Sequence, residues 1–129
     1  MGKKKSKFHN VKVEGPNGQK FDSKKELARY NELVKMESQG LIYNLRRQVK
    51  YTLLSSIYEQ VTVQLKRKVT TKQVCLFRET SYTADFVYDK DGEEVVEDVK
   101  ASQSFQDPVY KLKKKLMYMI HHIKIKEIY

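Results

Sequence analysis

Two carboxylates and one lysine stand out on two neighbouring apolar segments of the chain. Asp85 lies in SYTADFVY, and Asp98 and Lys100 lie in VVEDVKA. Side chains alternate between the faces of a strand, so Asp98 and Lys100 share a face while Glu97 points to the other. Charged groups among Val, Phe and Tyr are costly to bury unless a metal ion or a partner compensates them. This pattern predicts a catalytic site.

A short turn, DKDGEE, joins the two segments and predicts that they pair as one antiparallel hairpin. Asp98 rather than Glu97 then faces the charged patch, unless a bulge exchanges the two. The four acidic residues in and around the turn are most simply explained by exposure to water: Asp89, Asp91, Glu93 and Glu94.

The charge of the chain is the strongest signal in its composition. Its 129 residues carry a formal net charge of +10, with 33% charged and 40% hydrophobic residues. Such an excess of positive charge favours a polyanionic partner, and nucleic acid is the usual one. Acidic membrane lipid is the competitor, and a basic protein that is merely soluble is a third alternative. No apolar run approaches the roughly 20 residues that a membrane-spanning helix needs, so we expect no membrane partner.

The length predicts one domain, which we place at residues 11–129, after a basic arm at residues 1–10. The single cysteine, Cys75, lies in the strand-like run QVCLF, which predicts a buried thiol in a reducing compartment. The three histidines lack the spacing of a metal site. Because the chain carries no targeting signal, we expect a cytoplasmic location.

Capping residues predict two helices. Ser23 is a favourable N-cap for the first, Glu26 follows three residues later, and Gly40 lies just past its end. The second helix opens at Asp107-Pro108, a capping residue followed by proline. Its expected core stripe consists of Val109, Leu112, Leu116, Met119 and Ile120.

The remaining segments have strand patterns and predict a mixed sheet. QVCLF and the two strands of the charged hairpin are close enough in sequence to form an antiparallel meander. The basic stretch 66–73 is expected to be an exposed turn or loop. The order of elements is typical of an α/β fold, with a central mixed sheet flanked by two main helices. The other expected elements are a small hairpin at 11–21, strands at 47–54 and 61–69, and a last strand at 123–129.

The charged residues and their order resemble those of the PD-(D/E)XK nuclease superfamily, whose fold is the restriction endonuclease-like core. The matching residues are Glu26 on the first helix, Asp85 in the hairpin, and Asp98-Val99-Lys100 on the next strand. The runs FDSKKE, ADFVY, VEDVKA and DPVYKLKKKL are also similar to a small family of phage and prophage proteins with this core. Asp-x-Lys alone is a weak motif, and Ala84 stands where the superfamily name puts proline. The ordered set between two capped helices is more specific, and the likeness spans residues 8–129.

The resemblance implies a role for each residue in hydrolysing a phosphodiester bond. Asp85 and Asp98 would bind Mg²⁺, with Mn²⁺ as a substitute, and the carbonyl oxygen of Val99 would complete the coordination. Lys100 would orient the attacking water and offset the developing negative charge. Glu26 would add a ligand, directly or through water, or support a second metal ion. One metal ion and two remain open alternatives.

Most of these residues also have a purely structural alternative. Glu26 pairs naturally with Ser23 as a capping box. Asp98 and Lys100 could form an ion pair on an exposed face of the sheet. Asp85 is harder to explain in this way, because it interrupts an apolar strand. Relatives often carry auxiliary polar residues at the positions of Gln48 and Ser102, and less clearly at that of Gln103.

The positive charge and the resemblance together indicate DNA as the substrate. Contacts from Lys and Arg to phosphates give affinity and salt dependence but little sequence information. No recognition helix or zinc finger indicates base readout, which favours an enzyme specific for DNA structure. The candidate DNA-binding residues are Lys3, Lys4, Lys5, Lys7, Arg46, Arg47, Lys66, Arg67, Lys68, Lys111, Lys113, Lys114 and Lys115.

We therefore expect a small Mg²⁺-dependent endodeoxyribonuclease, encoded by a phage or prophage and similar to the Holliday junction resolvases of DNA recombination. It would act on branched or duplex DNA in the cytoplasm of a bacterial host, and we expect no small-molecule substrate. Cutting two strands requires a homodimer, because one chain carries one site; the sequence does not identify the dimer surface. The alternatives are a single-strand or nicking nuclease of phage replication or packaging, and a catalytically silent DNA-binding module.

Overall fold

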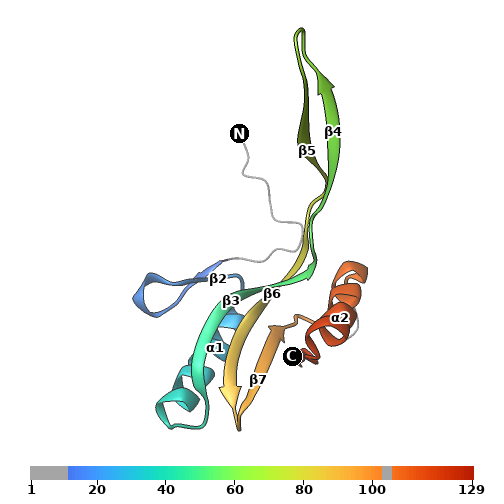
Figure 1. Cartoon of the computed structure of the whole chain (residues 1–129). Coiled ribbons are helices and arrows are strands. Elements are labelled where there is room, and N and C mark those ends of the chain that lie inside the picture. The colour runs from blue at the N-terminus through green and yellow to red at the C-terminus, as the bar shows by residue number, and fades with distance from the viewer. Residues whose placement is uncertain (1–11, 103–105) are drawn as a thin grey trace.

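The computed structural model describes residues 12–102 and 106–129 and contains a central sheet of four strands in the order β3-β6-β7-β8 (Figure 1). Strands β3, β6 and β7 are antiparallel, whereas β8 runs parallel to β7. The expected α/β class with a central mixed sheet is therefore confirmed. The strands are β3 (Tyr43–Leu54), β6 (Thr80–Lys90), β7 (Glu93–Val99) and β8 (Lys126–Ile128).

Two helices, α1 (Lys24–Ser38) and α2 (Pro108–His121), begin at the predicted capping residues. The hydroxyl oxygen of Ser23 accepts a hydrogen bond from the Glu26 N–H, and the Asp107 carboxylate accepts one from the Val109 N–H. The helices contribute to separate cores. The α1-side cluster is Phe21, Leu33, Ile42, Phe86 and Tyr88, and the α2-side cluster is Leu53, Tyr82, Ala84, Val87, Val96, Met117 and Ile125.

The face that α2 turns toward the sheet differs from the predicted one, of which only Leu116 packs against the α2-side cluster. Four residues of the expected stripe are exposed, namely Val109, Leu112, Met119 and Ile120. The sheet is met instead by Tyr110, Lys114, Met117 and His121, which follow i, i+4, i+7 and i+11 spacing. Periodicity marks an apolar stripe, but here the helix is rotated so that three polar tips bond to Glu127 and the Thr52 carbonyl while Met117 fills the core.

The hairpin that carries the acidic pair forms as predicted. Strands β6 and β7 pair with Phe86 opposite Glu97, and a two-residue turn joins them. Asp91 (φ 52°) and Gly92 (φ 80°) both take left-handed backbone conformations, which matches the right-handed twist of the two strands.

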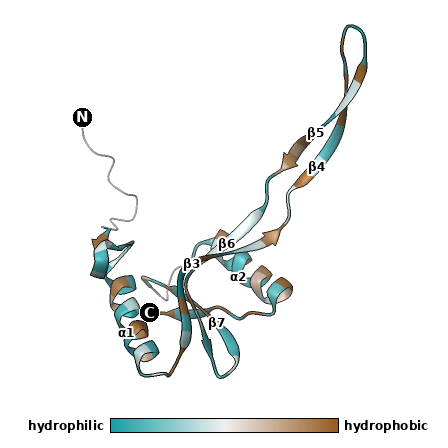
Figure 2. Cartoon of the chain, turned by 60° about the vertical axis from the view of Figure 1, so that its left-hand side comes forward, coloured by the Kyte–Doolittle hydropathy of each residue, from teal (hydrophilic) through white to brown (hydrophobic). Residues whose placement is uncertain are grey.

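A second pair of strands, β4 (Ile57–Gln64) and β5 (Val69–Phe77), forms a two-stranded sheet of its own. In both views these strands project away from the central sheet and the helices, as a continuation of β3 and β6 (Figure 1; Figure 2). We call them the β-arm. Three predictions were wrong here. Residues 69–73 are strand rather than loop, QVCLF does not join the central sheet, and Cys75 is exposed, because β5 pairs only with β4.

Near the N-terminus, β1 (Val13–Glu14), the short 3₁₀ helix η1 (Pro16–Gly18) and β2 (Lys20–Phe21) form the expected small hairpin. Strand β3 begins earlier than predicted, and β8 is shorter than the predicted last strand. In residues 12–102 and 106–129, no helix is long and apolar enough to cross a membrane.

Candidate functional site

One cleft of about 310 Å³ gathers the residues that the sequence singled out for catalysis. It lies where α1, β6 and β7 meet. Four carboxylates and two lysines line it, which gives a formal charge of −2 in a chain of net charge +10. The lining residues are Asp22, Ser23, Lys25, Glu26, Asp85, Asp98, Val99, Lys100 and Ala101.

An irregularity in two strands places Asp85 at this cleft. Ala84 belongs to the α2-side cluster and the α1-side cluster holds Phe86, although residues two apart on a regular strand share a face. On the neighbouring strand, Leu45 packs with the α1-side cluster whereas Val49 packs with the other. Gln48, between them, has φ 51°, which interrupts the regular alternation. The alternation of both strands changes phase here, so Asp85 belongs to neither core.

The Asp85 carboxylate is held by the next strand. Its Oδ2 atom accepts a hydrogen bond of 2.8 Å from the Val99 N–H. The N–H and C=O of one strand residue point to the same side. The Lys100 N–H points the opposite way, toward the Ile128 carbonyl oxygen at 2.7 Å. The Val99 carbonyl oxygen therefore lies on the Asp85 side, where it can serve as a ligand.

Asp98 and Lys100 share a face, as strand alternation predicted. The Lys100 ammonium is 2.9 Å from Asp98 Oδ1, and the Tyr82 hydroxyl donates to Asp98 Oδ2. The Lys100 nitrogen also lies 3.1 Å from the ring centroid of Tyr110 on α2. Both tyrosines were missed by sequence reasoning, because their roles depend on the packing of α2 against β6. Together they fix the position of this acid–lysine pair.

Glu26 is buried and reaches the cleft from the first turn of α1. Its carboxylate accepts from the Asp22 N–H at 3.3 Å and from the Gln48 side-chain amide at 3.3 Å. The same amide lies 3.5 Å from Asp85 Oδ1, so Gln48 bridges two of the carboxylates. The capping alternative is only half met, because Ser23 caps the helix while the Glu26 carboxylate is directed toward Asp22 and Gln48.

The carboxylates of the cleft are partly buried and repel one another, which raises the pKa values of Asp85 and Glu26. Burial, together with the charges of Asp98 and Glu26, raises the pKa of Asp85 from 3.8 to about 7, although the hydrogen bond from the Val99 N–H lowers it. Burial also raises the pKa of Glu26, together with the charge of Asp22. Raised carboxyl pKa values in a cleft are typical of functional sites. A divalent cation bound between these carboxylates would offset their repulsion, as a proton does.

The cation ligands are close together but are not yet arranged as a metal site. Within the described ranges, no three His, Cys, Asp or Glu side chains form a ready metal-binding group. In this arrangement Lys100 occupies Asp98 Oδ1, and the Val99 N–H occupies Asp85 Oδ2. The donor set of two carboxylates and a carbonyl consists of the hard oxygen atoms that Mg²⁺ and Mn²⁺ prefer.

Glu97 lies on the opposite face from Asp98, as predicted, and has a different role. Its carboxylate is fully buried and accepts hydrogen bonds of 2.8 and 2.7 Å from the Arg29 guanidinium of α1. The Tyr88 hydroxyl donates to the same carboxylate. Glu97 is thus compensated inside the protein, whereas its neighbour Asp98 opens on the cleft.

Several proposed DNA-binding residues have internal partners instead. The Arg47 guanidinium lies 3.8 Å from the ring centroid of Phe21, donates to the Lys20 carbonyl, and is 3.8 Å from Glu26 Oε1. Arg46 is near Glu94, and Lys114 pairs with Glu127. These contacts hold Arg47 against Phe21 and Glu26 and leave its side chain 20% exposed.

The remaining candidates are distributed over the surface. Lys66, Arg67 and Lys68 are exposed at the tip of the β-arm. On α2, Lys111 and Lys115 are exposed and Lys113 is half-buried. Ser102 is exposed and follows the last residue that lines the cleft. Outside the described residues lie Lys3, Lys4, Lys5, Lys7 and Gln103.

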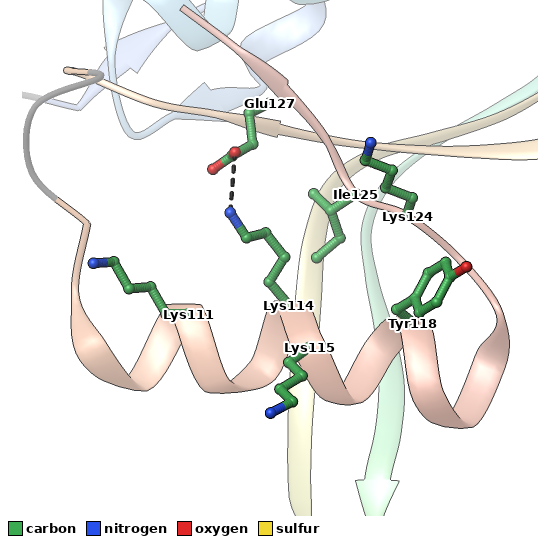
Figure 3. A pocket seen from close by; sticks show the side chains of 7 residues that line it. All are labelled: Lys111, Lys114, Lys115, Tyr118, Lys124, Ile125 and Glu127. Carbon is green, nitrogen blue, oxygen red and sulfur yellow. Dashed lines mark hydrogen bonds and ion pairs between the residues drawn. The ribbon is translucent and has the colours of Figure 1, made fainter.

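A second cavity, of about 460 Å³, lies between α2 and the chain that leads into β8 (Figure 3). Four lysines line it together with one carboxylate, Glu127, which is 3.2 Å from the Lys114 ammonium. Figure 3 shows Lys111 and Lys115 pointing away from that pair. The cations do not converge, and a lone paired carboxylate is a poor metal ligand set. This cavity therefore lacks the pattern that the first cleft has.

The family model described as "Protein of unknown function (DUF1064)" matches residues 5–129. The chain belongs to the DUF1064 family. The match includes every residue that lines the candidate cleft. A search of curated proteins and a search of solved structures found no match.

The raised pKa of Asp85 predicts how pH and metal ions affect the stability of this DUF1064 protein. The folded pKa of about 7 exceeds the ordinary value of 3.8, so the folded state favours the protonated carboxyl group. The stability that this protonation contributes is present below pH 3.8 and is lost as pH rises through 7. In EDTA, Asp85→Asn should therefore raise the melting temperature, and by more at pH 8 than at pH 5. Mg²⁺ or Mn²⁺ should stabilise the unmodified protein at pH 8 but hardly at pH 5, because a proton then competes for Asp85.

Thermal melts of both proteins, with EDTA or metal at the two pH values, provide the measurement. The Asp85→Asn variant is the control for the metal effect and should show little stabilisation at either pH. A variant that is less stable than the unmodified protein at pH 8 would indicate that Asp85 is a structural carboxylate.

Proposed function

We propose that this protein is a metal-dependent DNA endonuclease that hydrolyses phosphodiester bonds. The observation that carries the proposal is the cleft lined by the carboxylates of Glu26, Asp85 and Asp98 and by Lys100. The cleft is negative in a strongly basic chain. That combination suits an enzyme whose surface attracts a polyanion and whose cleft attracts a divalent cation.

Asp85, Asp98 and the Val99 carbonyl would hold Mg²⁺ or Mn²⁺, and Glu26 would contribute a ligand directly or through water, or support a second metal ion. When bound, the cation would acidify a water molecule and offset charge on the phosphate oxygens. Gln48 bridges Glu26 and Asp85, so it would keep both carboxylates turned toward the cleft. Tyr82 holds the second oxygen of Asp98, which restricts the rotation of that side chain.

Lys100 is the residue we assign to the attacking water and the developing negative charge. The Tyr110 ring lies under its ammonium group, and the side chain is only 19% exposed. A restrained, half-desolvated ammonium stabilises a transition state more strongly than one in open water, because less reorganisation is needed. Lys100 would exchange its contact with Asp98 for one with the scissile phosphate.

DNA is favoured over a small phosphodiester by the net charge of +10. We infer a structure-specific activity on branched DNA, similar to a Holliday junction resolvase, in the cytoplasm of a bacterial host. A homodimer would place two clefts on two strands.

Cleavage of a panel of labelled DNAs tests this proposal. The panel should contain a four-way junction, a flap, a linear duplex and single-stranded DNA, each with Mg²⁺, Mn²⁺ or EDTA. We expect paired symmetric nicks in the junction that require metal, together with a dimer on gel filtration.

The other outcomes separate the competing functions. Preference for single strands or unpaired nicks in duplex would replace the resolvase by a nicking or single-strand nuclease. DNA binding without metal-dependent cleavage of any substrate would contradict the enzyme and leave a DNA-binding module.

A further inference from the structure

The β-arm has no partner within the described residues, although it carries strongly basic and hydrogen-bonding side chains. From Gln60 to Arg78 the chain holds five cations and no acidic residue. Three of the cations, Lys66, Arg67 and Lys68, follow one another at the tip, where β4 turns into β5. Side chains are exposed along the whole of β5, and apart from Val61 and Val63 along β4. A charge excess in one protruding element indicates a polyanionic partner.

The register of the β-arm sorts its side chains onto two faces. Cross-strand partners share a face, and they pair Gln60 with Gln73 and Thr62 with Thr71. Gln64 follows on the same face opposite Val69, so this face presents exposed amides and hydroxyls beside one exposed valine. The opposite face carries the half-buried Val61 and Val63 together with their exposed partners Lys72 and Thr70. Gln and Thr side chains are suited to hydrogen bonds with base edges in a groove.

We propose that the β-arm binds duplex DNA, with its Gln and Thr face in the major groove and its cationic tip on the phosphates. The major groove, about 12 Å wide, admits a two-stranded β-ribbon. Eight residues of β4 at a rise of about 3.3 Å span about 26 Å, or roughly eight base pairs. This inference rests on the proposed function only in taking DNA as the partner. The proposal adds that the β-arm contacts duplex DNA several base pairs away from the phosphodiester bond that would lie in the cleft.

A binding experiment without metal tests the arm separately from the chemistry. The test variant is Lys66→Ala/Arg67→Ala/Lys68→Ala. The matched control is Lys12→Ala/Lys35→Ala/Lys90→Ala, which removes the same charge from exposed sites elsewhere. Fluorescence anisotropy of a labelled duplex of about 30 base pairs, in EDTA and over a series of salt concentrations, gives the affinity and its salt slope.

We expect the tip variant to bind more weakly by about tenfold or more, with the salt slope reduced by about 0.9 for each lost phosphate contact. The control should lose less than about threefold. On a duplex of about 10 base pairs, which cannot span both regions, the difference between the variants should shrink. Circular dichroism checks that both variants fold.

A truncated arm provides a second test that does not depend on the tip. Replacing residues 61–72 by Asn-Gly joins the cross-strand partners Gln60 and Gln73 through a two-residue turn. This variant should lose duplex affinity as the tip variant does, with an unchanged oligomeric state by sedimentation.

Two results would overturn the inference. The first is an equal loss of affinity in the tip and control variants. The second is a truncated arm that changes the oligomeric state and leaves DNA affinity intact, which would make the arm an interface between copies of the chain. Failure of the proposed nuclease would look different, because it would abolish cleavage and leave these binding results unchanged.

Discussion

Replacing Lys100 by alanine is expected to lower metal-dependent DNA cleavage by about 10²–10³-fold, because the transition state loses a positioned positive charge. Asp85→Asn should lower it at least as much, since a cation ligand becomes neutral. DNA binding in EDTA should change little in either variant, because phosphate contacts elsewhere supply most of the affinity. Single-turnover cleavage of a labelled substrate, with binding measured in parallel, gives both quantities.

Lys25→Ala is the matched control for the lysine. Lys25 also lines the cleft, but it is exposed and makes none of the contacts that hold Lys100 to Asp98 and Tyr110. We expect a much smaller loss of cleavage in this variant. A lower melting temperature in both Lys100→Ala and Asp85→Asn, without a selective loss of cleavage, would contradict the catalytic role. Asp98 and Lys100 would then form a structural ion pair.

The second large effect is expected on stability rather than on activity. Arg29→Ala should lower the free energy of unfolding by about 3–5 kcal/mol, because the buried Glu97 carboxylate loses its compensating charge. Glu32→Ala, which removes the exposed partner of the same arginine, should cost less than about 1 kcal/mol. Urea unfolding of both variants provides the comparison.

Equal effects of these two variants would show that Glu97 is not held by Arg29 in the way its hydrogen bonds indicate. The contrast matters for the cleft, because Glu97 and Asp98 are adjacent in sequence. The Glu97 carboxylate is bonded by Arg29 and Tyr88 within the fold, whereas the Asp98 carboxylate lines the cleft beside Lys100.

The local features of the fold could be predicted because they depend on short-range chemistry. Ser23 and Asp107 cap their helices through their own side chains, and Asp91-Gly92 supplies the backbone angles of the hairpin. Strand alternation separated Glu97 from Asp98 and placed Lys100 beside the latter. Each of these predictions needed only residues close in the sequence.

The features that were missed depend on contacts between distant segments. The run QVCLF predicted a strand but not its partner, so this strand was expected in the central sheet rather than in the β-arm. The sequence predicted an apolar stripe on α2. In the structure a different face of this helix packs against the sheet, where Tyr110 and Lys114 bond to Glu127.

The cleft itself was predicted in membership but not in detail. Glu26, Asp85, Asp98 and Lys100 are brought together as expected. The change in side-chain alternation at Gln48 and Asp85 could not be predicted, because a glutamine such as Gln48 does not indicate a left-handed backbone conformation within a strand. The contacts of Arg47 with Phe21 and Glu26 were not predicted, because the three residues are distant in the sequence.

The most direct test of the central claim is to locate a cation in the cleft. Crystals grown with Mn²⁺ at pH 8 allow the ion to be found by anomalous diffraction. We predict a peak between the Asp85 and Asp98 carboxylates, next to the Val99 carbonyl oxygen, with the Lys100 ammonium moved away from Asp98. A cleft with no anomalous peak, and with Lys100 still 2.9 Å from Asp98 Oδ1, would contradict a metal-dependent site.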